Sequence, residues 1–138
     1  MAQPEHLNKT DVKGFTVEGI GKDFVPDSIS REYIDDWVKV YDKESYAVAR
    51  DLIKQEGLLC GGSCGSAVYG AFKYLKDNNL HKNKDLRIVV ILPDSIRNYL
   101  TKFCCDDWMV QKGFNPTTSI ENKAHPLYGK SCADLKVK

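Results

Sequence analysis

The sequence predicts an α/β fold, with a partial, open and mostly parallel sheet and helices flanking it. Short apolar segments alternate along the chain with stretches whose apolar residues recur at helical spacing. The run at 87–92 shows no polar alternation, which is typical of a strand covered on both faces. A strand–helix–strand order favours a right-handed crossover between parallel strands. Only about three strands are expected, so we expect an incomplete domain with exposed sheet edges.

The composition narrows the function classes. The chain has 138 residues, of which 42% are apolar and 28% charged, and its formal net charge is +1. Acidic and basic residues are interspersed without a basic block, which argues against nucleic-acid binding. No apolar stretch approaches the roughly 20 residues of a membrane span, and the polar start is unlike a signal peptide. We therefore expect a cytoplasmic protein with no membrane partner.

The cysteines do not predict a metal site or structural disulfides. Their number is odd and no secretory signal precedes them, which disfavours disulfides. None of the spacings is the Cys-x-x-Cys of a zinc knuckle, and the histidines are scattered, so no metal ligand is expected. A redox pair formed by Cys60 and Cys64 stays open, although small buried thiols are favoured. The cysteines are Cys60, Cys64, Cys104, Cys105 and Cys132.

The first forty residues are expected to contain one strand and one helix. Residues 1–13 are polar and are expected to be a disordered or cut start. Residues 15–21 have the character of a short strand running into a glycine loop. A helix is expected after two serines that can cap it, over residues that repeat at helical spacing: Ile34, Trp37, Val38 and Tyr41.

The middle of the chain is expected to hold further helices and a strand. A helix starts at Asp42 and ends at Gly57, where a glycine is suited to the helix terminus. Residues 66–76 form the next helix, with one apolar face. The buried strand at 87–92 follows a polar connection, and another helix is expected over 96–103.

Glycine or hydroxyl loops follow each of the expected strands. The turn at 61–66 follows a short apolar extended piece at 57–60 and combines glycines, serines and a cysteine. A second loop follows the strand at 15–21. Pro93 and Asp94 form the third loop. The carboxyl edge of an open α/β sheet is where such loops form a ligand site. The turn lacks both the P-loop and the Gly-x-Gly-x-x-Gly pattern, and a purely structural role for its glycines remains an alternative.

Long ordered blocks of the sequence resemble the cystathionine β-synthase family. These blocks lie at 17–26, 55–63 and 89–99, and the block at 108–114 fits this family better than the cysteine synthases. The family belongs to the pyridoxal-phosphate enzymes of fold type II, whose domain is tryptophan synthase β-like. The resemblance implies that residues 14–114 are the carboxyl half of the catalytic domain. It also implies that residues 115–138 are a linker toward a regulatory domain.

The resemblance assigns cofactor contacts to two of the loops. Ser63 matches the serine whose hydroxyl meets the pyridine nitrogen of pyridoxal phosphate, where a neutral group tempers the electron sink. Gly61 and Gly62 match glycines that let the backbone approach the ring. Pro93 and Asp94 match the loop beside the pyridine edge.

The resemblance assigns substrate contacts to the loop that follows the first strand. Glu18, Gly19, Ile20 and Gly21 match the segment that closes on the substrate. Two residues next to these sites depart from the family pattern. They are Lys22, where an aromatic residue is usual, and Cys64, where alanine is usual.

No catalytic residue is expected on this chain. The Schiff-base lysine and the phosphate-binding Gly-Thr-Gly-Gly-Thr lie upstream in the family, as do the haem-binding Cys and His of animal members. The full-length parent is expected to condense serine with homocysteine and to form a homodimer or homotetramer. Two alternatives remain: a cysteine synthase that uses O-acetylserine and sulfide, and a short non-catalytic protein that binds a partner through an exposed apolar edge.

Overall fold

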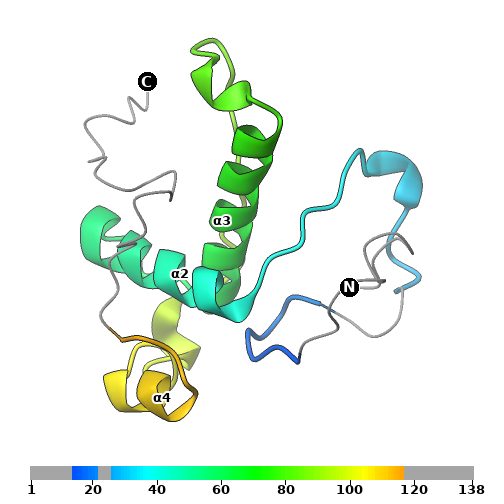
Figure 1. The fold of residues 1–138 in the computed structure, drawn as a ribbon. Coiled ribbons are helices and arrows are strands. Elements are labelled where there is room, and N and C mark those ends of the chain that lie inside the picture. Colours follow the sequence, from blue (N-terminus) through cyan, green and yellow to red (C-terminus); the bar gives the residue numbers. More distant parts are fainter. Residues whose placement is uncertain (1–13, 22–25, 117–138) are drawn as a thin grey trace.

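Two crossed helices form the centre of the structure. The computed structural model describes residues 14–21 and 26–116. Helix α2 spans Asp42–Glu56 and helix α3 spans Gly62–Asp77, and α3 packs across α2 (Figure 1). The short helix α4, Asp106–Gln111, follows much later in the chain. Short 3₁₀ helices complete the regular structure of the described residues: η1 (Arg31–Tyr33), η2 (Leu80–Lys82) and η3 (Ile96–Asn98).

Backbone contact between α2 and α3 depends on Gly65. A Cβ atom at this position would lie 1.9 Å from the Ser45 carbonyl oxygen and 2.6 Å from the Ala49 nitrogen. Only glycine fits between the two helices there. The Ser66 hydroxyl of α3 donates a 2.8 Å hydrogen bond to the Ser45 hydroxyl of α2, which itself donates to the Tyr41 carbonyl at 2.8 Å. The polar groups at this buried crossing are therefore satisfied.

The apolar core adjoins the crossing of α2 with the start of α3 and is largely aromatic. The Tyr46 ring stacks on Phe103, with ring centroids 5.4 Å apart, and meets Trp108 and Phe114 edge-on. Offset and edge-to-face contacts of this kind are the favoured arrangements of aromatic pairs. The core cluster of buried residues consists of Val17, Tyr46, Ala49, Tyr99, Phe103 and Met109.

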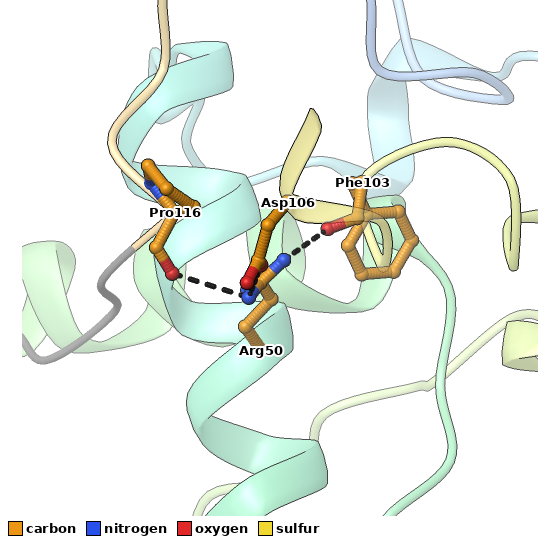
Figure 2. A network of polar contacts seen from close by, with 4 residues as sticks. All are labelled: Arg50, Phe103, Asp106 and Pro116. Carbon is orange, nitrogen blue, oxygen red and sulfur yellow. Dashed lines mark hydrogen bonds and ion pairs between the residues drawn. The ribbon is translucent and has the colours of Figure 1, made fainter. Parts of the chain in front are cut away.

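Arg50 of α2 ties the carboxyl-terminal part of the described chain to this core. Its guanidinium donates to the Phe103 carbonyl at 2.8 Å and to the Pro116 carbonyl at 3.1 Å, and it pairs with the Asp106 carboxylate (Figure 2). The planar guanidinium has enough donors to satisfy all three acceptors at once. The segment around α4 is thereby fixed to α2.

No strand is present among residues 14–21 and 26–116, so the expected strands at 15–21 and 87–92 are not observed. The described residues contain only an isolated antiparallel bridge between Cys60 and Ser95. The apolar run at 87–92 is unpaired and open to solvent, with Val89 85% and Ile91 77% exposed. A strand needs a neighbouring strand for its backbone hydrogen bonds. The described chain places none beside this run.

The prediction of a helix at 34–41 is also wrong. Only the short η1 forms, and the following residues take an irregular path toward α2. Val38 and Val40 both lie near Gly70 of α3, at 4.0 Å and 3.5 Å from the position of its Cβ. Alternate residues thus face α3, which is the side-chain pattern of an extended segment and not of a helix.

The helix expected over 96–103 is replaced by a series of tight turns. The Tyr99 nitrogen donates to the Ile96 carbonyl, the Lys102 nitrogen to the Tyr99 carbonyl and the Cys105 nitrogen to the Lys102 carbonyl. These turns bring both Tyr99 and Phe103 into the core, at 8% and 1% exposure. The helix expected at 66–76 does form, but it begins earlier, at Gly62.

The described residues contain no helix with the length and apolar character needed to cross a membrane. The start expected to be disordered (residues 1–13) lies outside the described residues, as does all of the expected linker beyond Pro116.

Candidate functional site

The candidate site is built around the first turn of α3. Gly61 is the extended residue before the helix, Gly62 is its first residue, and Ser63 follows. The Ser63 side chain is buried, with 7% of the residue exposed, and its hydroxyl makes no hydrogen bond to any other described residue. By contrast, the buried hydroxyls of Ser45 and Ser66 both have protein partners. Ser63 therefore offers a hydroxyl that is available for a ligand at a helix N-terminus.

The structure brings the Pro93–Asp94 loop against this turn. The Gly61 N–H donates a 3.2 Å hydrogen bond to the Asp94 carbonyl. A Cβ at position 61 would lie 2.0 Å from Oδ1 of Asp94, so the glycine makes room for that carboxylate. Pro93 itself is exposed. We expected Gly61 to let the backbone approach the cofactor ring. In this structure the space beside Gly61 is occupied by the Asp94 carboxylate.

The Asp94 carboxylate is hydrogen-bonded by Tyr99. The Tyr99 hydroxyl donates a 2.5 Å hydrogen bond to Oδ2 of Asp94. This hydrogen bond, with a smaller contribution from burial, raises the pKa of Tyr99 to about 12. Tyr99 therefore remains a neutral donor at physiological pH, and Asp94 has an assured partner.

The two cysteines of the turn are buried thiols. Cys60 is 3% exposed and Cys64 is fully buried. Burial first, and then the neighbouring Cys64, raises the pKa of Cys60 to about 12, so this thiol stays protonated. The Cys64 thiol donates to the Asp94 carbonyl, with an Sγ–O distance of 3.4 Å. Cys64, which stands where the resemblance implies an alanine, thus fits in the turn and makes a weak hydrogen bond.

The glycine loop at 18–21 lies beside the same helix start. Val17, which precedes it, is buried, and its Cγ1 is 3.7 Å from the position of a Gly62 Cβ. Gly19 and Gly21 both have a φ of 81°, a conformation that side chains disfavour. Ile20 packs against the core cluster and Glu18 is exposed, forming an ion pair with Lys102.

Two residues contact this loop in a way that the sequence did not predict. Asp42 accepts hydrogen bonds from the backbone of Thr16 and Val17, although its sequence position predicts only a helix start. Lys102 reaches Glu18 across 84 residues of chain. Contacts between such distant residues follow from the fold and not from local pattern.

No group of three His, Cys, Asp or Glu side chains within residues 14–21 and 26–116 is arranged to hold a metal ion. The chemistry that the candidate site offers is hydrogen bonding, through the Ser63 hydroxyl, a helix N-terminus and an oriented carboxylate.

Comparison with known proteins points to one family. The family described as pyridoxal-phosphate dependent enzyme matches residues 2–94. Cystathionine beta-synthase of Dictyostelium discoideum is 54% identical over 138 residues, which cover 98% of this chain and 27% of that protein. The rabbit (Oryctolagus cuniculus) cystathionine beta-synthase is 54% identical over 114 residues, or 83% of this chain and 20% of the rabbit protein.

The cystathionine beta-synthase of Saccharomyces cerevisiae is 53% identical over 109 residues, which cover 79% of this chain and 21% of the yeast protein. The resemblance drawn from the sequence blocks is confirmed by these identities. The chain spans between about a fifth and about a quarter of the length of the curated relatives it matches.

Proposed function

Because the chain belongs to the pyridoxal-phosphate dependent enzyme family, we propose that it supplies the pyridine side of a cofactor site in a cystathionine β-synthase. The complete protein would condense L-serine with L-homocysteine to cystathionine and water. It would act in the cytoplasm as a homodimer or homotetramer, as the resemblance implies. The proposal for the whole protein rests on identities of 54% to two cystathionine beta-synthases.

The hydroxyl of Ser63, which makes no hydrogen bond to any other described residue, carries the proposal for the site. Such a hydroxyl is available to donate to a ligand atom that accepts. A pyridine nitrogen without a proton is an acceptor, and a serine hydroxyl is a donor. The residues present therefore fit the ring edge of pyridoxal phosphate. When bound, the cofactor supplies an electron sink for chemistry at the α-carbon of an amino acid.

Asp94 has a supporting role in this arrangement. Its carboxylate is engaged by Tyr99 and fills the space beside Gly61. Because Tyr99 already donates to the Asp94 carboxylate, Asp94 would lie near Ser63 without taking part in a hydrogen bond to the ring nitrogen. A neutral donor at Ser63 leaves the ring uncharged, which favours elimination of a leaving group from the β-carbon over deeper carbanion chemistry.

The loop at 18–21 is proposed to border the substrate. It lies next to the start of α3 through Val17, and Gly19 and Gly21 give its backbone a turn that residues with side chains disfavour. Glu18 and Ile20 would flank the bound amino acid. The Schiff-base lysine and the phosphate-binding segment would come from the part of the relatives that this chain does not span.

A chimeric enzyme tests the proposal. The matching region of the Dictyostelium relative is replaced by this chain, and cystathionine formation from serine and homocysteine is measured. In the chimera, Ser63→Ala should lower kcat/KM by roughly tenfold to a hundredfold, because one hydrogen bond to the cofactor is lost. Ser63→Asp should bind the cofactor but lose the reaction. The matched control is Ser30→Ala, since Ser30 is an exposed serine whose hydroxyl donates to the Glu32 carboxylate far from the candidate site in the sequence.

The outcomes separate the alternatives. An unchanged kcat/KM in Ser63→Ala would contradict the assigned contact. Faster conversion of O-acetylserine and sulfide to cysteine than of serine and homocysteine would favour a cysteine synthase. A chimera that folds and binds pyridoxal phosphate but performs neither reaction would contradict the proposed activity.

A second function, docking onto a longer family member, is favoured by the exposed run at 87–92. In this alternative the run, with Val89 and Ile91 the most exposed, pairs with a sheet supplied by that partner. Size-exclusion chromatography of the chain mixed with a Dictyostelium protein that lacks the matching region tests it. Co-elution would support docking, and separate elution would exclude it.

A further inference from the structure

Asp42 connects the start of α2 to the loop at 14–21. As the first residue of α2, it could be expected to serve its own helix, but its carboxylate turns to Thr16 and Val17 instead. Oδ2 accepts from the Thr16 N–H at 2.5 Å and from the Thr16 hydroxyl at 2.8 Å. Oδ1 accepts from the Val17 N–H at 3.2 Å. Two consecutive backbone amides and a hydroxyl thus share a single carboxylate.

Tyr46, one turn further along α2, reinforces this attachment. Its hydroxyl lies 3.1 Å from the Thr16 hydroxyl, within hydrogen-bond distance, while its ring is part of the buried core. The Thr16 side chain is therefore held by both Asp42 and Tyr46. The loop is anchored to α2 by polar contacts at the two residues that directly precede Glu18.

The other polar contact of the loop is weaker. Glu18 and Lys102 form an ion pair whose side chains are 54% and 39% exposed. Pairs between exposed charges contribute little because water and salt screen them. The Asp42 contacts to Thr16 are exposed as well, but they are charge-assisted hydrogen bonds, and the contact to the Val17 N–H is partly buried. Among the described contacts, Asp42 thus accepts three of the hydrogen bonds that attach the loop.

We propose that Asp42 is a positioning residue that orients the Glu18–Gly21 loop toward the start of α3. Fixing two consecutive amides sets the direction in which the chain leaves Val17, and Gly19 and Gly21 then turn the loop from that fixed edge. Asp42 acts through the loop and does not touch the proposed cofactor contact at Ser63. This inference rests on the proposed function for the identity of the substrate but not for the attachment itself.

A purely helical role for Asp42 makes a different prediction. An acidic residue in the first turn also stabilises a helix through its dipole, and Glu44 lies in the same turn. Glu44→Ala removes a first-turn charge without removing the contacts to Thr16 and Val17. Asp42→Asn keeps one acceptor for the loop and removes the charge. These two variants separate positioning of the loop from support of the helix.

Amide hydrogen exchange of the 138-residue chain tests the attachment without any cofactor. In Asp42→Ala, exchange of the Thr16 and Val17 amides should accelerate at least about tenfold, whereas amides within α3 should change by less than about twofold. Asp42→Asn should show an intermediate effect, and Glu44→Ala should leave the two loop amides unchanged. Unchanged loop amides in Asp42→Ala would overturn the proposal. Equal acceleration in the loop, α2 and α3 would also overturn it, because that result indicates loss of fold stability alone.

The chimeric enzyme supplies a second readout. Asp42→Ala should raise the KM for the amino-acid substrates several-fold and leave the affinity for pyridoxal phosphate within about twofold, with partial recovery in Asp42→Asn. A fall in cofactor affinity with unchanged KM would contradict the assignment to the substrate loop. If the loop amides are released in the free chain but Ser63→Ala has no effect on the chimera, the attachment holds and the proposed function fails.

Discussion

The hydroxyl of Tyr99 donates a 2.5 Å hydrogen bond to the carboxylate of Asp94, and this pair closes the Pro93–Asp94 loop against Gly61. Because Tyr99 is also buried in the aromatic core, the loop and the core are coupled at this residue. The relationship predicts how the stability of the fold depends on pH.

The stabilisation from Tyr99 should disappear at high pH. Its pKa is raised from the ordinary value of 10.0 to about 12 in the folded protein, mainly by the hydrogen bond to Asp94. The raised value means that the neutral form is favoured by folding. This stabilisation is complete below about pH 10 and is lost as the pH rises toward 12.

The measurement is the free energy of unfolding in urea at a series of pH values for the wild type and Tyr99→Phe. The advantage of the wild type should shrink by on the order of 2 kcal/mol between about pH 10 and 12. Tyr33→Phe is the control, because Tyr33 is 81% exposed and should show no such pH dependence relative to the wild type. A constant difference between wild type and Tyr99→Phe across this range would show that the hydrogen bond is absent in solution.

Replacing Arg50 should destabilise the fold more than replacing its charged partner. Arg50→Met removes the donors to the Phe103 and Pro116 carbonyls, which should cost roughly 2–3 kcal/mol in the free energy of unfolding. Asp106→Asn should cost less than about 1 kcal/mol, because the Asp106 side chain is 66% exposed. Urea unfolding of both variants measures the difference. Equal effects would mean that the ion pair, and not the carbonyl contacts, provides the stabilisation.

Gly65→Ala and Gly70→Ala should have opposite effects although both lie in α3. The Cβ at position 65 would collide with the Ser45 carbonyl at 1.9 Å, so α2 and α3 must separate, at a cost of about 3 kcal/mol or more. The Cβ at position 70 would make ordinary contacts with Val40 at 3.5 Å and Val38 at 4.0 Å, and alanine favours the helix by up to about 1 kcal/mol. Thermal unfolding followed by circular dichroism compares them. A tolerated Gly65→Ala would contradict the close crossing of the helices.

Charges placed on the exposed run should reduce self-association without unfolding the chain. Val89 and Ile91 are 85% and 77% exposed, and unpaired apolar segments of this kind promote association between chains. The double variant Val89→Lys, Ile91→Lys should therefore be more monomeric in light scattering, with a melting temperature within a few degrees of the wild type. A large drop in melting temperature would instead indicate that the run is buried in the free chain.

Local patterns predicted the parts of the fold that depend on neighbouring residues. The helix expected from Asp42 to Gly57 is confirmed as α2, and Gly57 ends it with a φ of 69°. The apolar face at 66–76 belongs to α3 as expected. Capping and helical periodicity act within a few residues, so a single sequence is sufficient to show them.

Features that depend on distant residues were not predictable. The run at 87–92 has the composition of a buried strand, yet the described residues provide no strand to pair with it. The contacts of Asp42 with Thr16 and of Lys102 with Glu18 join residues 26 and 84 positions apart. The candidate turn at Gly61–Ser63 was located from the sequence, whereas its neighbour Tyr99 was expected only as the inner face of a helix.

The close crossing at Gly65 has a mechanical consequence. The Ser45–Ser66 hydrogen bond and the backbone contact at Gly65 hold α2 and α3 against one another. The glycine loop is attached to α2 through Asp42, and Ser63 lies on α3. The separation of the two candidate subsites is therefore set by how closely the two helices cross at Gly65.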